Sequence, residues 1–157
     1  MKKILIVLGL LLATQLQFAV APFLRISGVA PNLVLVLIMF WIAQNGFDNN
    51  WGWIVLVGVF LDCSSGHLFG LVSLSLILTA YLVGLLNTKI FSAAKFWMLV
   101  FSVAVGTLLY EVLLVVLSHF FQSDLIFSYQ YLIVEVAYHI VLLLIIFYGF
   151  KKILHQE

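Results

Sequence analysis

Charged residues are scarce in this sequence. Asp, Glu, Lys and Arg make up 8% of its 157 residues, whereas 66% are hydrophobic and the mean hydropathy is +1.28. Globular domains carry roughly a quarter of charged residues, so a water-soluble protein of this length is excluded and a lipid bilayer is the solvent that fits. The net charge of +1 also excludes the clustered basic surface that nucleic-acid binding requires.

The residue patterns of catalytic and metal sites are absent as well. The single cysteine, Cys63, has no partner for an intrachain disulfide, and the sequence contains no Cys/His spacing typical of a zinc site. It also lacks a GxSxG nucleophile elbow, an HExxH helix and a glycine-rich phosphate loop. We therefore expect a protein that is not an enzyme and that uses no cofactor or metal.

Long apolar runs are what the sequence does contain. A spanning helix needs about 20 residues, and the chain is predicted to be an all-α integral membrane protein, a single domain over 1–157 with six transmembrane helices in a compact bundle. Ala19-Val20-Ala21 has the form of a signal-peptide cleavage site, but we expect Pro22 to hinder processing, so the first helix is expected to stay uncleaved. The six helices are expected at about 4–23, 29–43, 47–61, 68–86, 96–118 and 129–150.

Basic residues predict the orientation, because cytoplasmic loops are enriched in them. If all six segments cross and the amino terminus is inside, six lysines are cytoplasmic and only Arg25 faces out. All four tryptophans then lie at the inner boundary, an interface that amphipathic rings prefer. We expect a multi-pass protein of the cytoplasmic (inner) membrane with both termini in the cytoplasm. The residues concerned are Lys2, Lys3, Lys89, Lys95, Lys151 and Lys152, together with Trp41, Trp51, Trp53 and Trp97.

A polar cluster is predicted within the outer half of the membrane. Glu111 and Glu135 fall outward of the midpoints of their helices, and His139 follows Glu135 at the i, i+4 spacing that puts both on one helix face. With Asp62 at the outer end of the third helix, these groups could meet in one pocket. Acids at helix interfaces often only lock the packing, and this interpretation is favoured over a ligand, proton or ion site, which stays open.

The densest local pattern runs from Gly58 to Gly70, where Gly58, Asp62, Gly66 and Gly70 recur every four residues. The segment Asp-Cys-Ser-Ser-Gly favours a turn between two helices. We expect Ser65 to cap a helix that begins near 68, and Asp62 to bond the free amides of 64–66. The glycines are expected to let the third and fourth helices approach closely, with a binding role as the alternative.

This pattern, G-x-x-x-D-x-x-S-G-x-x-x-G, followed by Thr79-Ala80-Tyr81-Leu82, resembles the MreD family of bacterial rod shape-determining membrane proteins. Pro31-Asn32 at the start of the second helix is also similar to that family, as is an acid in the fifth helix, here Glu111. One departure is Ala30, which stands where family members often have an Arg before the proline. Any role of that basic group is therefore lost or passed to Arg25.

The resemblance implies a non-catalytic membrane scaffold of the elongation (rod) complex, which supports cell-shape maintenance and peptidoglycan synthesis. It implies a bitopic MreC-like partner, the RodA and class B penicillin-binding protein complex and the MreB filament, within membrane lipid. Partner helices would dock by close packing at small residues. Gly9, Gly84 and Gly106 are candidate contacts, with internal packing as the alternative.

A second function remains open because the MreD fold is similar to that of the substrate-binding subunits of energy-coupling-factor vitamin transporters. Such a subunit needs a ligand pocket rich in Trp, Asn or charged groups beneath its outer loops. The orientation predicted above puts every Trp on the inner side, which favours the scaffold.

Overall fold

The computed structural model describes residues 2–26, 28–48, 50–66, 68–90, 95–121 and 132–154, with no strand in these ranges. The prediction of an all-helical chain with six α-helices is confirmed for them. The helices are α1 (Lys2–Ala19), a short 3-10 helix η1 (Ala21–Leu24), α2 (Leu33–Asn45), α3 (Trp51–Ser65), α4 (Leu71–Ile90), α5 (Lys95–Phe120) and α6 (Leu132–Leu154).

Three helices begin later than the sequence indicated. The second was expected from 29, but Ile26 and Val29 exchange both backbone hydrogen bonds at 3.0 Å, and this tight turn postpones the helix until Asn32 caps it. The third was expected from 47 and begins at Trp51, because a turn in which the Asn50 amide donates to the Phe47 carbonyl at 2.9 Å precedes it. The fourth was expected from 68 and begins at Leu71, because α3 continues through Asp62 to Ser65. The expected start of the sixth helix, 129–131, lies outside the described residues.

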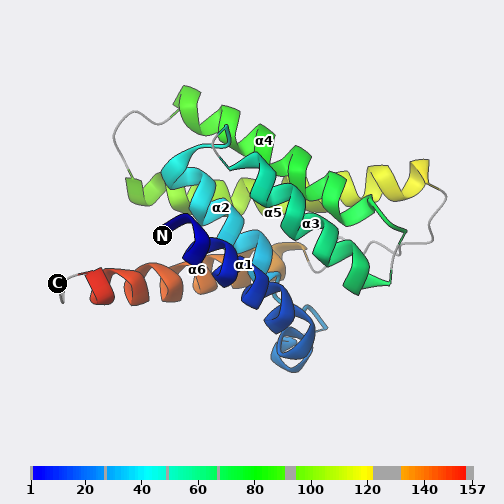
Figure 1. The fold of residues 1–157 in the computed structure, drawn as a ribbon, viewed down its shortest axis with the longest axis horizontal. Helices are drawn as coiled ribbons and strands as arrows, with labels where there is room; N and C mark the ends of the chain where they lie inside the picture. The colour runs from blue at the N-terminus through cyan, green and yellow to red at the C-terminus, as the bar shows by residue number, and fades with distance from the viewer. Residues whose placement is uncertain are drawn as a thin grey trace.

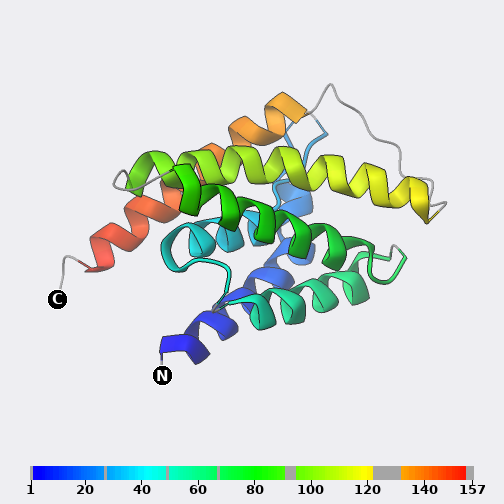
Figure 2. The ribbon, with the colours of Figure 1, turned by 90° about the horizontal axis from the view of Figure 1, so that it is seen from above.

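Successive helices alternate in direction (Figures 1 and 2). One end of the molecule, which we call the terminal end, holds the start of α1 and the end of α6. The ends of α2 and α4 and the starts of α3 and α5 lie there too. The opposite end, called the turn end, holds the α1–α2 and α3–α4 connections, the end of α5 and the start of α6. An even number of alternating helices thus returns the chain to its starting side.

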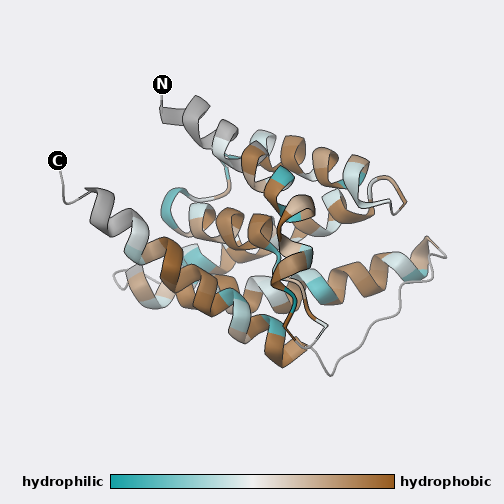
Figure 3. Cartoon of the chain, turned by 90° about the horizontal axis from the view of Figure 1, so that it is seen from below, coloured by the Kyte–Doolittle hydropathy of each residue, from teal (hydrophilic) through white to brown (hydrophobic). Residues whose placement is uncertain are grey.

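Helix α2 occupies the centre of the bundle, where it contacts α1, α4, α5 and α6. A helix that is apolar on every side must be buried, and α2 carries only apolar residues up to Ala43. Its buried side chains are Val34, Leu35, Val36, Ile38, Met39, Phe40, Ile42 and Ala43. The helices around it keep apolar outer faces, seen as brown ribbon on α5 and α6 in Figure 3.

Three helices in the described ranges are long and apolar enough to cross a membrane, over Leu71–Lys89, Phe96–Phe120 and Leu132–Gly149. Helices α2 and α3 are also apolar but shorter, with 13 and 15 residues.

Close packing occurs at three glycines, Gly58, Gly84 and Gly106. A Cβ added to Gly58 in α3 would lie 2.8 Å from the Cβ of Ser73 and 2.9 Å from its Cα, so α4 leaves no space for a side chain. A Cβ on Gly106 in α5 would lie 2.6 Å from the Met39 sulfur of α2. Gly58 therefore sets the distance between α3 and α4.

Candidate functional site

Asp62 holds the start of α4. Its carboxylate oxygens accept hydrogen bonds from the backbone amides of Gly70 at 3.0 Å, Val72 at 2.9 Å and Ser73 at 3.2 Å. The Ser73 hydroxyl donates to the same carboxylate. Asp62 is 3% exposed, and these donors satisfy the amides that the first turn of a helix leaves without intrahelical partners. The carboxylate is thus the N-terminal cap of α4, supplied from the preceding helix.

This arrangement corrects the roles expected for the turn. Ser65 was expected to cap the fourth helix and Asp62 to bond the amides of 64–66. Ser65 instead lies in the last turn of α3, where its hydroxyl donates to the Asp62 carbonyl at 3.2 Å. The physical reason is that α3 continues one turn further than its apolar pattern, which places the Asp62 side chain level with the α4 amides.

The turn between α3 and α4 depends on two glycines. Gly66 ends α3 with a φ of 70° and Gly70 precedes α4 with a φ of 99°, in the left-handed region that disfavours side chains. Neither has an atom within 4 Å of an added Cβ. Of the four glycine-motif positions, Gly58 serves close approach, whereas Gly66 and Gly70 serve backbone conformation.

A second polar cluster surrounds the start of α2, which we call the α2 junction: Gln17, Pro31, Asn32, Thr107, Tyr110 and His139. Asn32 accepts from the Leu35 amide at 3.0 Å through its side chain, as an N-cap does. Its backbone N–H donates to Nε2 of His139 at 2.8 Å. Tyr110 of α5 lies near this side chain. The start of α2 is therefore bonded to α6, and α2 also packs against α5.

The hydrogen bonds of His139 define its tautomer. Because Nε2 accepts from a backbone N–H, the ring proton sits on Nδ1 and faces the Thr107 hydroxyl at 2.9 Å. The Thr107 hydroxyl in turn donates a hydrogen bond to the Val103 carbonyl at 2.8 Å. His139 is 0% exposed, so a neutral imidazole bridges α2, α5 and α6 with both nitrogens satisfied.

Gln17 attaches α1 to the same junction. Its side-chain amide donates to the Pro31 carbonyl at 2.9 Å and its oxygen accepts from the Leu33 amide at 2.7 Å. Pro31 has no N–H to donate, and the Gln17 side chain pairs with the backbone on either side of Asn32. A further bond runs from the Tyr138 hydroxyl of α6 to the Leu24 carbonyl at 2.8 Å. Four helices, α1, α2, α5 and α6, meet here.

Glu111 of α5 and Glu135 of α6 lie close to each other where the two helices meet. Both side chains are half-buried. The structure thus brings Glu111, Glu135 and His139 to neighbouring turns of the α5–α6 contact, whereas Asp62 is engaged at the α3–α4 turn.

Four residues of the two clusters were not identified as site residues from the sequence: Gln17, Ser73, Thr107 and Tyr110. Gln17 lies in a mainly apolar helix together with Gln15, which was an available signal because an amide side chain inside a spanning helix needs a partner. Ser and Thr carry no comparable signal, since their hydroxyls can bond the carbonyl four residues earlier, as those of Ser75 and Thr79 do.

Within the described ranges, no group of three or more His, Cys, Asp or Glu side chains could hold a metal ion. The Asp62 carboxylate, the His139 imidazole and the Gln17 amide are each bonded to helix backbone. The side chains of the two clusters therefore join helices by hydrogen-bonding the backbone groups at helix ends that lack partners within their own helix.

Comparison with known families then decides the identity. A family model described as rod shape-determining protein MreD matches residues 1–153 of the 157. The chain belongs to the MreD family. The resemblance found in the sequence is confirmed, and membership implies a role in rod shape determination.

MreD is a shape-determining, structural family, and this agrees with clusters whose side chains bond helix backbone. Together with three apolar helices of spanning length, membership indicates a membrane protein. No curated protein and no solved structure was found to match the chain. The likeness to energy-coupling-factor subunits therefore stays a prediction.

Proposed function

We propose that this chain is a six-span, non-catalytic scaffold of the rod complex in the cytoplasmic membrane, which supports cell shape and peptidoglycan synthesis by binding the transmembrane helices of partners. The observation that carries the proposal is the division of the described chain into an interior and a surface. In the interior the buried polar side-chain atoms are paired, except the amide nitrogen of Asn87, and the outer helix faces are apolar. Family membership supplies the process, and the helix faces supply the mode of action.

The helix directions support six crossings with both termini inside. The alternation puts Lys2 at the start of α1, Lys89 near the end of α4 and Lys151 near the end of α6 at one end of the molecule. Arg25 follows η1 at the opposite end. Cytoplasmic loops carry the excess of basic residues, so the terminal end is the cytoplasmic one.

The tryptophans agree with this orientation. Trp41 lies in the last turns of α2, Trp51 begins α3 and Trp97 lies in the first turn of α5, all at the terminal end. Trp51 is 60% and Trp97 66% exposed, as expected for rings at a membrane interface.

The outer face of α6 is the best candidate for a partner helix. Its exposed apolar residues Ile133, Val141 and Ile145 lie on one ridge at multiples of four, with Ala137 between them. Helices associate in lipid by shape-matched packing rather than by hydrophobic burial, and such a ridge gives a straight surface. Gly84 and Gly106 are unsuited to this role because they pack against Phe47 and Met39 of the same chain. Gly9 on α1 is exposed and stays a candidate.

The partners proposed are those of the family's process: an MreC-like bitopic protein, the RodA and class B penicillin-binding protein pair, and the MreB filament. The vitamin-transporter function has less support, because the polar groups of the α2 junction are already bonded to one another and to backbone. A single test addresses both functions.

That test is in-cell photocrosslinking from single positions on different faces: Ile145 on α6, Val112 on α5, Leu78 on α4 and Leu16 on α1, with buried Leu76 as the control. We expect an adduct with a single-helix membrane protein from at least one exposed face and none from Leu76. A protein that yields no adduct from any face but co-purifies with a vitamin would overturn the scaffold.

A further inference from the structure

Helix α3 is too short to cross the hydrocarbon layer. Its 15 residues from Trp51 to Ser65 extend about 22 Å, whereas the apolar layer is about 30 Å thick. Trp51 anchors the first residue at the inner interface under the proposed orientation. The outer end of α3 therefore falls about 8 Å short of the outer boundary, and any tilt lowers it further.

Helix α4 is displaced in the matching direction. It has 20 residues, about 30 Å, and begins directly after the same turn. If its first residue lies below the outer boundary, its last turn must project beyond the inner one. That last turn is the polar run Asn87, Thr88 and Lys89, of which Thr88 and Lys89 are exposed.

The amides at the α4 end of the turn have hydrogen-bond partners within the protein, which irregular backbone inside a membrane requires. The amides of Gly70, Val72 and Ser73 bond the Asp62 carboxylate. The amide of Leu71 donates to the Leu68 carbonyl at 3.2 Å. Four consecutive amides thus need no water.

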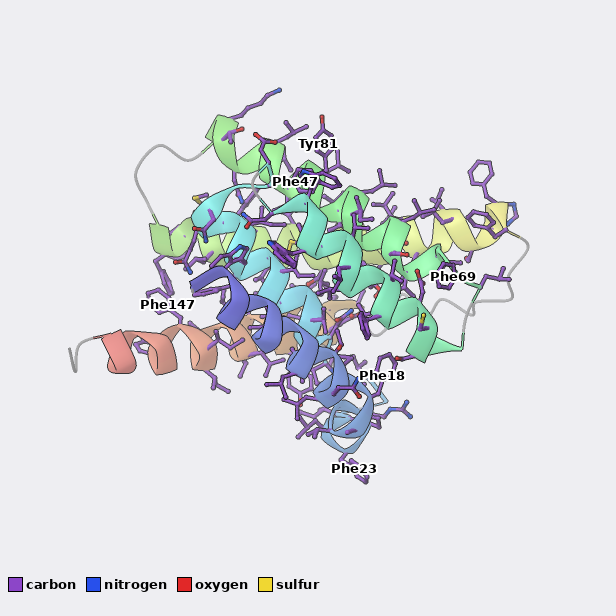
Figure 4. All side chains as sticks on the ribbon, in the orientation of Figure 1. Phe18, Phe23, Phe47, Phe69, Tyr81 and Phe147 are labelled. Carbon is purple, nitrogen blue, oxygen red and sulfur yellow. The ribbon has the colours of Figure 1, made fainter. Side chains whose placement is uncertain are left out.

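The exposed side chains in the described part of the turn are mostly apolar, with Ser64 as the polar exception. Leu68 is 49% exposed and Phe69 is 70% exposed, and Figure 4 places Phe69 at the turn end. Cys63, in the last turns of α3, is exposed as well. Within the described residues from Gly58 to Leu74, Asp62 is the one charged side chain, and it is buried.

We propose that the described part of the α3–α4 turn, residues 62–66 and 68–71, is submerged in the outer leaflet and contacts phospholipid acyl chains instead of the aqueous phase. The inference rests on the six-span orientation proposed above. As a consequence, the helices end at different depths on the outer side of the membrane. Helix α5, with 26 residues and about 39 Å, projects past the membrane surface, whereas the α3–α4 turn lies below it. A partner that reaches this side must do so from within the bilayer.

Cys63, the single cysteine, is a native probe for the test. The full chain is spin-labelled at Cys63 and reconstituted in phosphatidylethanolamine–phosphatidylglycerol vesicles. Collisions are then measured with oxygen, which concentrates in hydrocarbon, and with a water-soluble nickel chelate. Two controls in a Cys63→Ser background are Leu78→Cys, exposed midway along α4, and His119→Cys, exposed near the end of α5.

We expect the oxygen-to-nickel collision ratio at Cys63 to match that of Leu78→Cys and to exceed that of His119→Cys several-fold. A nickel-accessible Cys63 would overturn the proposal, as would a label that neither reagent reaches, since protein would then cover the turn. Sidedness is measured separately by labelling intact cells with an impermeant maleimide. Labelling of Lys89→Cys but not His119→Cys would refute the proposed orientation without altering the depth result.

Discussion

Asp62 is the residue with the most hydrogen-bond partners in the described chain. It joins α3 to α4 by accepting from three backbone amides and one hydroxyl, and each donor would otherwise be left unpaired in an apolar surrounding. The sequence marked this residue through its place among glycines, but which amides it bonds depends on where α3 ends.

The first prediction concerns this cap. Asp62→Ala leaves several buried donors without partners, and we expect it to lower the free energy of unfolding by about 3 kcal/mol or more. Asp62→Asn keeps one acceptor oxygen and should lose less. The measurement is thermal unfolding in detergent. The control is Ser65→Ala, which removes the hydroxyl that donates to the Asp62 carbonyl but leaves the Asp62 carboxylate in place. Equal melting temperatures for Asp62→Ala and Ser65→Ala would contradict the assigned cap.

The second prediction compares two glycines of the same helix. Gly58→Ala places a Cβ 2.9 Å from the Ser73 backbone and should lower the melting temperature. Gly52→Ala is the matched control, because an added Cβ there has no atom within 4 Å. Alanine favours a helix by up to about 1 kcal/mol over glycine, so Gly52→Ala should leave stability unchanged or raise it. Similar effects at both positions would mean that close packing at Gly58 is unimportant.

At the scale of elements, α6 packs against α5 and α2, with His139 and Leu143 as its buried side chains in the described part. Its hydrogen bonds to the rest of the bundle run from His139 to Asn32 and Thr107, and from Tyr138 to the Leu24 carbonyl. The i, i+4 relation of Glu135 and His139 was read correctly as one helix face. Their partners differ, and only the packing of α5 and α2 against α6 assigns them.

The third prediction tests that attachment. His139→Leu leaves the Asn32 N–H without an acceptor, and we expect a loss of about 2 kcal/mol together with faster hydrogen exchange at the start of α2. His119→Leu is the control, since His119 is exposed near the end of α5. If exchange at Asn32–Leu35 is the same in both variants, the bond from Asn32 to His139 does not hold α2 in place.

For the whole molecule, six alternating helices put the start of α1 and the end of α6 at one end. With the six crossings proposed above, both termini lie on one side of the bilayer, and the distribution of lysines predicts that this side is the cytoplasm.

The fourth prediction follows. Fluorescent-protein fusions at either terminus should fluoresce, and alkaline phosphatase fusions at either terminus should be inactive. Because the phosphatase folds only outside the cytoplasm, activity at one terminus alone would mean that an odd number of helices crosses.

The sequence by itself determined the solvent, the helical class and the family of this protein. Composition requires lipid, apolar runs of spanning length in lipid must become helices because their backbone has no other partners, and the spacing from Gly58 to Gly70 is read without knowing any contact. Tertiary structure decided which groups pair: that Asp62 caps α4, that Gln17 and His139 meet at Asn32, and that Gly106 accommodates Met39. Such pairings depend on where each helix ends, to within one turn, and on how each helix is rotated about its axis. An apolar sequence specifies this rotation only weakly, because every face of a helix such as α2 is equally hydrophobic.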